Sequence, residues 1–220
     1  MKWVHDNGLT LALAALFIVS VVGQAWTGWA AETEDQLRHG QAAPQLFEYL
    51  GSGAFLSALF ENWESEFLQM WAFVMMTAYL IQKGSPESRK PDEENPQDRD
   101  PRLDENKPEA PWPVRAGGLV RVVYSHSLGI ALLALFIASF VLHWVNSMRH
   151  AAEEALAHGE TPPTLMQRLG EAEFWFESFQ NWQSEFLSTA VLIVLAIYLR
   201  ERHSPESKPV GEAHAKTGSD

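Results

Sequence analysis

Long apolar segments alternate with polar segments along this chain, and the pattern predicts helices. Apolar stretches occur at about residues 9–29, 67–81, 119–145 and 186–199. The first and third are long enough to cross a hydrocarbon core of roughly 30 Å as helices. The second and fourth reach that length only if their helices begin near Phe60 and Phe179, which would place a polar stretch inside each helix.

The first apolar stretch has a second interpretation. Residues 1–32 combine a lysine near the start, an apolar run and small residues at Ala30 and Ala31, as a cleaved signal peptide does. A matching segment recurs deep inside the chain, however, and an internal copy cannot be a cleaved leader. We therefore expect the first stretch to be part of the folded protein.

The sequence resembles itself when it is shifted by 119 residues. "ALFIVSVV" then lies on "ALFIASFV", "NWESEFL" lies on "NWQSEFL", and "SPES" lies on a second "SPES". Such similarity without gaps indicates two copies of one structural unit. Each copy predicts a helix, an outer loop and a second helix, so both copies have the same orientation and are related by an axis along the membrane normal.

The repeat predicts the fold class and the domain boundaries. We expect an all-α fold, an integral membrane four-helix bundle formed by tandem duplication of a two-helix unit, with short amphipathic outer helices. The first two-span repeat covers residues 1–84 and the second covers 116–203. Residues 85–115 are rich in proline and charge, and the tail at 204–220 is similar. We expect both segments to be disordered, because they bury too little apolar surface to offset the entropy of ordering.

Lysine and arginine are distributed unevenly between the predicted sides of the membrane. The termini and the linker carry 13 of the 16 basic residues, whereas the outer loops hold Arg38, Arg149 and Arg168. The positive-inside rule therefore predicts cytoplasmic termini and a cytoplasmic linker. Tryptophans at the predicted outer helix ends agree with an aromatic belt. The formal net charge of −12 argues against nucleic acid as a partner.

The outer loops have a shared pattern. Residues 32–40 and 151–159 predict helical continuations of the first and third spans, with Gly40 and Gly159 as C-terminal stop residues. Residues 44–60 and 163–179 predict short amphipathic helices. These helices either lie on the outer membrane interface or cap the bundle.

The repeated motif places polar side chains on one helix face. Helical spacing of i, i+3, i+4 and i+7 gives two intramembrane stripes, one formed by Asn62, Ser65, Glu66 and Gln69 and the other by Asn181, Ser184, Glu185 and Ser188. The first copy has glutamates at 61 and 64 where the second has glutamines at 180 and 183. We therefore infer that a carboxylate is not required at those two positions.

Three interpretations of the stripes remain open. The polar groups can form hydrogen bonds between helices or with the backbone, which is a structural role. Glu66 and Glu185 can instead form a cation or proton site near the pseudo-symmetry axis. The third interpretation is a metal site above the membrane that adds His39 and His158, although nothing in the spacing enforces their convergence. No nucleotide, phosphate-binding or triad motif is visible, so we expect no cofactor and no catalytic residue.

The chain resembles an uncharacterised family of small bacterial integral membrane proteins, a domain of unknown function. The resemblance rests on the outer His-Gly pairs, the repeated Asn-Trp-x-Ser-Glu-Phe-Leu stretch and the Ser-x-Glu-Ser ending of each repeat. It implies a location in the bacterial inner membrane and no known activity. We expect a structural or accessory, non-enzymatic multi-pass protein whose partners are the lipid bilayer and a homo-oligomer or larger membrane complex. The alternative is a small cation- or proton-conducting transporter or channel.

Overall fold

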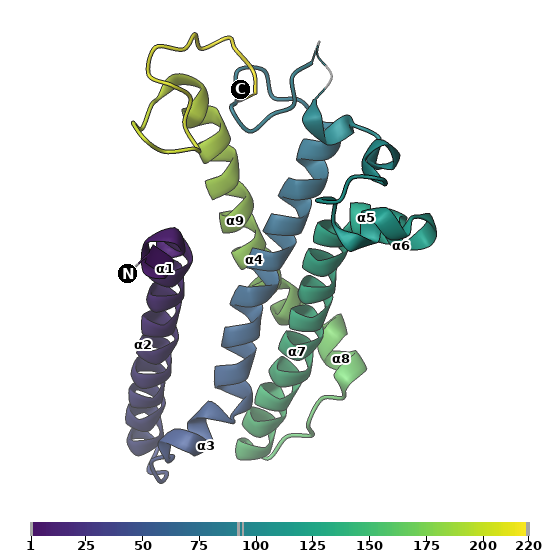
Figure 1. The fold of residues 1–220 in the computed structure, drawn as a ribbon. Coiled ribbons are helices and arrows are strands. Elements are labelled where there is room, and N and C mark those ends of the chain that lie inside the picture. Colours follow the sequence, from purple (N-terminus) through teal and green to yellow (C-terminus); the bar gives the residue numbers. More distant parts are fainter. Residues whose placement is uncertain (1, 92, 94, 219–220) are drawn as a thin grey trace. The chain divides into compact units, whose positions relative to one another are not determined.

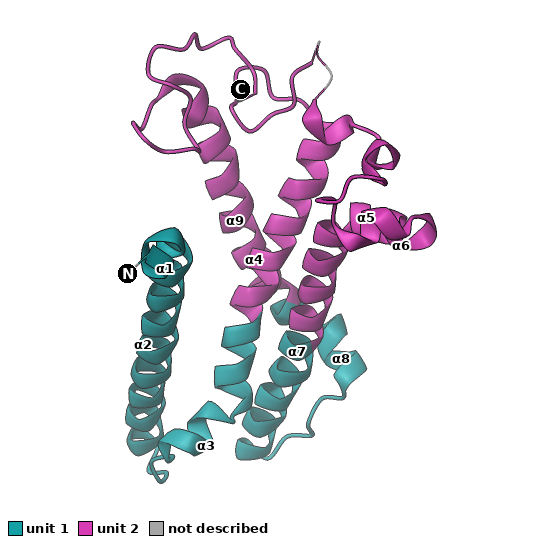
Figure 2. Cartoon of the chain, viewed as in Figure 1, with its two compact units in different colours: residues 1–60, 142–174 teal, residues 61–141, 175–220 magenta. Residues whose placement is uncertain are grey.

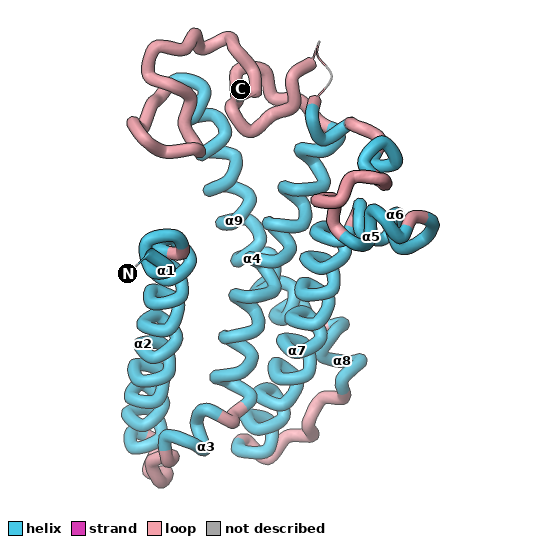
Figure 3. The backbone as a smooth tube through the Cα atoms, in the orientation of Figure 1, coloured by secondary structure: helices cyan, strands magenta, loops and turns pink. Residues whose placement is uncertain are grey.

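The computed structural model describes residues 2–91, 93 and 95–218, and it contains no strand within those residues. The predicted all-α class is therefore confirmed for the described part of the chain (Figures 1 and 3). The helices of the first half are α1 (Lys2–Asp6), α2 (Gly8–Arg38), α3 (Leu46–Leu50) and α4 (Gly53–Tyr79). The helices of the second half are α5 (Trp112–Ala116), α6 (Gly118–Ser125), α7 (Ser127–Ala157), α8 (Leu165–Gly170) and α9 (Ala172–Tyr198).

The two halves of the chain have matching helices. Helices α2 and α7 each contain 31 residues, and α4 and α9 each contain 27. Both pairs keep the spacing of 119 residues found in the sequence, as their bounds show. Residues at equivalent positions therefore occupy equivalent places on equivalent helices, which allows the two copies to be compared side chain by side chain.

The third apolar stretch is divided between two helices. Helix α6 ends at Ser125, and α7 begins at Ser127 after a break at His126, where φ is −117° and ψ is 9°. The equivalent break lies at Asn7, where φ is −120° and ψ is 16°. Periodicity alone did not reveal either break, because valine, leucine and tyrosine continue the apolar pattern across the second one.

Glycine ends the two longest helices, as the sequence predicted. Helices α2 and α7 stop at Arg38 and Ala157, and both Gly40 and Gly159 have a φ of +73°. A residue with a Cβ rarely adopts this left-handed conformation, so glycine is favoured there.

Tryptophan side chains attach the long helices α2 and α7 to the short helices α3 and α8. The indole Nε1 of Trp29 donates to the Pro44 carbonyl at 2.9 Å, and Nε1 of Trp144 donates to the Leu165 carbonyl at 2.8 Å. The sequence assigned these side chains to an aromatic belt. The structure shows that their indole N–H groups also bind the backbone at the start of α3 and α8.

Two helices are long and apolar enough to cross a membrane, α2 and α7, in a search limited to the described residues. No residue of α2 is buried by the rest of the chain. Helices α4 and α9 are not among these candidates, and each carries the polar motif near its middle. The coarser expectation of two apolar, membrane-length helices is met, and four spans stay a proposal.

The chain divides into two compact units, and each repeat contributes to both (Figure 2). Unit 1 contains residues 1–60 and 142–174, and unit 2 contains residues 61–141 and 175–220. In unit 1, the fully buried Phe174 ring stacks on His143 with ring centroids 4.8 Å apart. In unit 2, the buried side chains include Glu64, Leu132 and Ile197.

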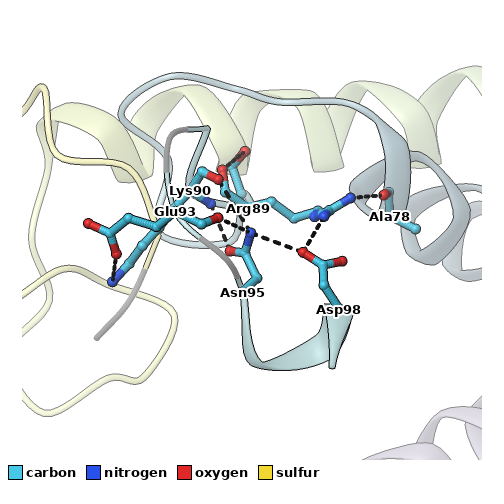
Figure 4. A network of polar contacts seen from close by, with 7 residues as sticks. Ala78, Arg89, Lys90, Glu93, Asn95 and Asp98 are labelled. Atoms are coloured by element: carbon cyan, nitrogen blue, oxygen red, sulfur yellow. Dashed lines mark hydrogen bonds and ion pairs between the residues drawn. The ribbon is translucent and has the colours of Figure 1, made fainter. Parts of the chain in front are cut away.

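The linker contains turns and short helices, whereas the described part of the tail consists of turns and irregular segments. Two 3-10 helices, η1 (Pro96–Asp98) and η2 (Pro101–Asp104), precede α5. Figure 4 shows how the start of the linker is attached: the Arg89 guanidinium donates to the Ala78 carbonyl at 2.7 Å and pairs with Asp98. The hydrogen bond from Arg89 lowers the pKa of Asp98. The disorder expected for 85–115 and 204–220 stays a prediction, and its residues 92, 94, 219 and 220 lie outside the described part.

Candidate functional site

The two copies of the motif contact each other through α4 and α9 in unit 2. The indole Nε1 of Trp182 donates to Glu64 Oε1 at 2.8 Å. The Asn181 side-chain amide donates to the Glu61 carboxylate. One turn or two further along, Gln69 Nε2 donates to Thr189 Oγ1 at 2.7 Å. These three contacts form a layer of polar side chains between two largely apolar helices.

Glu64 is the centre of this layer. Its side chain is fully buried, although glutamate is seldom buried unless its oxygens have partners. The indole N–H of Trp182 supplies such a partner, and the Glu64 side chain has no contact with solvent. Glu64 therefore acts as a fixed acceptor that specifies how α9 aligns with α4.

The pairing joins positions that are not equivalent in the repeat. Asn181 is the counterpart of Asn62, yet it binds Glu61, whose own counterpart is Gln180. The sequence comparison set Glu61 and Glu64 aside because the second copy has glutamine there. The structure shows that both acids are nevertheless hydrogen-bond acceptors for the second copy, Glu61 for Asn181 and Glu64 for Trp182, whereas Gln180 and Gln183 are exposed.

The predicted stripes are placed in different surroundings. Ser65 is buried, and Gln69, Asn181 and Glu185 are half-buried. The other four members are exposed: Asn62, Glu66, Ser184 and Ser188. Gln69 makes a direct hydrogen bond to α9, and Asn181 makes one to α4.

The serines of the stripes bond to their own helices. Ser65 Oγ donates to the Asn62 carbonyl at 2.9 Å, and Ser184 Oγ donates to the Asn181 carbonyl at 2.8 Å. Ser188 Oγ does the same with the Glu185 carbonyl at 2.9 Å. Bonds to a carbonyl one turn back let a hydroxyl stay inside an apolar helix without a partner on another element. These contacts support a structural role for the serines.

Glu66 and Glu185 are close enough for their charges to repel each other. Both lie in unit 2, Glu66 exposed on α4 and Glu185 half-buried on α9. Two neighbouring carboxylates can attract a cation or a proton, because either one relieves the repulsion. This feature favours the transport interpretation.

His39 and His158 line one cavity in unit 1. His39 and His158 belong to the ends of α2 and α7, and a cavity of about 600 Å³ includes both, together with His150. Nδ1 of His39 lies 2.9 Å from the Asp35 carbonyl, and Nδ1 of His158 lies 2.9 Å from the Glu154 carbonyl. The sequence had given no reason for these residues to converge, and the structure supplies the common cavity.

Acidic side chains and one phenol also line this cavity, among them Glu32, Asp35, Glu48, Glu153 and Tyr49. Burial, followed by the negative charge of Glu32, raises the pKa of Tyr49. Within the described residues, however, no group of three or more His, Cys, Asp or Glu side chains has the arrangement of a metal site. His39 and His158 share this cavity.

Another buried polar cluster, around Arg168 in unit 1, was not singled out from the sequence. The Arg168 side chain is almost fully buried; its Nε donates to Ser147 Oγ at 2.9 Å, and Nη1 contacts both Glu171 and Glu173 at 2.8 Å. In the first copy, Gly28 occupies the position equivalent to Ser147, and Tyr49 occupies the position equivalent to Arg168. A Cβ on Gly28 would lie 2.1 Å from the Tyr49 hydroxyl, so glycine makes room for the phenol there.

The two copies thus fill one structural position with different pairs, Gly28 with Tyr49 and Ser147 with Arg168. This replacement could have been found by asking where both members of a contacting pair differ between the two copies. A comparison restricted to identical residues could not find it.

The chain belongs to a family described as a domain of unknown function, DUF6766, whose model matches residues 1–219. This finding agrees with the resemblance to an uncharacterised family. No curated protein matches the chain, and no solved structure matches it. The family assignment therefore adds no functional residue, and the functional argument rests on the chain's own geometry.

Proposed function

We propose that this chain is a multi-pass membrane protein with a structural or accessory, non-enzymatic role. The observation that carries the proposal is the exposure of α2: its 31 residues include none that the chain buries, and its apolar window has a mean hydropathy of 2.0. Leu9, Leu16 and Val19 are each more than 60% exposed. An apolar surface of this length is stable against lipid or against another apolar helix.

The proposal includes four spans. A helix of 27 residues is about 40 Å long, so α4 and α9 are long enough to cross the membrane alongside α2 and α7. The hydrogen bond between Glu64 and Trp182 supports this arrangement, because polar groups in a membrane helix are stable when they pair with a neighbouring helix. The distribution of lysine and arginine supports cytoplasmic termini in a bacterial inner membrane.

The partners follow from the same surface. The lipid bilayer is the proposed solvent for α2, and a second copy of the chain or a larger membrane complex is the proposed protein partner. The contacts between the motifs bring together hydrogen-bond donors and acceptors rather than a nucleophile, a base and an oxyanion donor. This favours an accessory role over catalysis.

A small cation- or proton-conducting function is the second candidate, because the Glu66 and Glu185 charges interact in unit 2. Flux separates the two candidates. We expect liposomes containing the wild-type chain to show no proton or potassium flux above that of empty liposomes. We also expect the Glu66→Gln/Glu185→Gln variant to give the same result.

Flux in the wild type that disappears in this double variant, with its helical circular dichroism unchanged, would overturn the accessory role and support conduction. The Gln180→Glu/Gln183→Glu variant is a control, because it adds two exposed carboxylates without touching the Glu66–Glu185 pair.

A further inference from the structure

The same turn follows α4 and α9. After α4, the backbone N–H of Gln82 donates to Ser88 Oγ at 2.9 Å. After α9, the backbone N–H of Glu201 donates to Ser207 Oγ at 2.9 Å. Within each turn, the first serine of "SPES" accepts from the amide of the glutamate two residues later. The repeated "SPES" is therefore a closed turn that holds one glutamate in a fixed place.

The glutamates of the two turns meet in unit 2. The carboxyl groups of Glu87 and Glu206 lie within reach of each other, although the two residues are 119 positions apart at equivalent places in the repeat. Two carboxyl groups can share a hydrogen bond only when one of them holds a proton. Burial, followed by the hydrogen bond to Glu206 and the charge of Glu206, raises the pKa of Glu87 to about 7.

Glu87 faces a cavity of about 250 Å³ beside the end of α4. Most of the wall is apolar and is formed by Phe73, Met76, Leu80, Ile81 and Ile193. Ser85 and Ser88 complete the polar end, but their hydroxyls already close the turn. Glu87 is the one ionisable side chain among the residues that line this cavity in the described part of the chain.

The basic side chains that neighbour the two glutamates in sequence are directed to other partners. Arg89 pairs with Asp98 and the Ala78 carbonyl, and the Lys90 ammonium lies 3.4 Å from Glu93 (Figure 4). The Lys208 ammonium donates to the carbonyls of Ala213, His214 and Lys216 in the tail. The charge that acts on Glu87 is that of Glu206, which is also exposed to solvent.

We propose that this cavity binds a hydrophobic organic monocation, with its ammonium group against the Glu87–Glu206 pair and its apolar part against Phe73, Met76 and Ile193. The apolar wall accounts for the hydrophobic part of the ligand, and the carboxyl pair accounts for a single positive charge. A cation takes the place of the shared proton and stabilises both carboxylates.

The proposal has a definite pH dependence. A quaternary ammonium competes with the proton on Glu87, so it binds better when that proton has left. With a Glu87 pKa of about 7, its affinity should rise roughly ten-fold between pH 6 and pH 8. A neutral apolar molecule of similar size should show no such rise.

The test measures binding of radiolabelled phenyltrimethylammonium to the full-length chain in lipid nanodiscs by equilibrium dialysis, after subtraction of the signal from empty nanodiscs. The wild type should bind one equivalent saturably, with the stated pH dependence. Glu87→Gln should weaken binding at pH 8 at least ten-fold and remove the pH dependence, because glutamine keeps the shape but not the charge. Glu206→Gln should also weaken binding.

Glu201→Gln is the matched control, since it removes an exposed carboxylate from the same tail without touching the pair. It should bind like the wild type. Saturable binding that Glu87→Gln leaves unchanged would overturn the proposal, as would an absence of binding above empty nanodiscs. Retention of a lipid in native mass spectra, equal in the wild type and in the Glu87→Gln variant, would assign the cavity to an acyl chain instead.

Discussion

Replacing Gly53 with alanine is expected to lower the free energy of unfolding by about 1–3 kcal/mol, and valine is expected to cost more. Gly53 opens α4, and in unit 1 it lies directly against the backbone of α7. A Cβ there would be 2.4 Å from the His150 nitrogen, 2.8 Å from its Cα and 2.9 Å from the Asn146 carbonyl oxygen. Backbone atoms cannot rotate away as a flexible side chain can, so the two helices must separate.

Gly170→Ala is the matched control for this prediction. A Cβ on Gly170 meets nothing within 4 Å, and Gly170 ends α8 without a positive φ. Thermal unfolding of purified variants in detergent, followed by tryptophan fluorescence, gives the comparison. If both glycine variants unfolded at the same temperature as the wild type, the inference that Gly53 packs directly against the α7 backbone would be wrong. Ala172, which occupies the position equivalent to Gly53, shows that the second repeat tolerates a methyl group there.

Glu64→Leu is expected to destabilise the protein by about 1–3 kcal/mol, because it leaves the half-buried Trp182 indole N–H without its acceptor. Glu64→Gln should retain most of the stability, since an amide oxygen can accept the same bond. The measurement is chemical unfolding in mixed micelles, with the change in free energy taken from the transition midpoints.

A double-mutant cycle separates the hydrogen bond from other effects of the change. Trp182→Phe removes the donor, so the Glu64→Leu/Trp182→Phe variant should lose less stability than the sum of the single variants. Gln183→Leu serves as the control, because Gln183 is the exposed counterpart of Glu64. Additive losses in the cycle would show that Glu64 and Trp182 do not interact.

Local features of the fold were predictable from the sequence. The ends of α2 and α7 followed from Gly40 and Gly159, because a left-handed backbone at these positions excludes most other residues. The extension of α4 and α9 through the polar motif followed from the length that a spanning helix needs, but the two helices begin at Gly53 and Ala172 rather than near Phe60 and Phe179. The short helices predicted over 44–60 and 163–179 are therefore confined to α3 and α8. Both inferences use information that lies within a few residues of the feature itself.

Contacts between the copies were harder to predict. The sequence comparison weighted shared residues, whereas the bond from Trp182 to Glu64 depends on a position where the copies differ. "SPES" was recognised as a repeat marker, but its Glu87 and Glu206 could be paired only when the two turns were placed in space. In a chain with two similar copies, a donor in one copy can bind an acceptor in the other. Such a pairing cannot be recognised from the sequence of either copy alone.

The central claim is that the chain crosses the bilayer four times with both ends on one side. The native sequence contains no cysteine, so single cysteines can be introduced at Gln41 and Thr161 in the outer loops, at Gln97 in the linker and at Ala215 in the tail. We predict that a membrane-impermeant maleimide labels the first two from outside intact bacterial cells, and the last two only after permeabilisation. Labelling of Gln97→Cys from the same side as Thr161→Cys would contradict the four-span account.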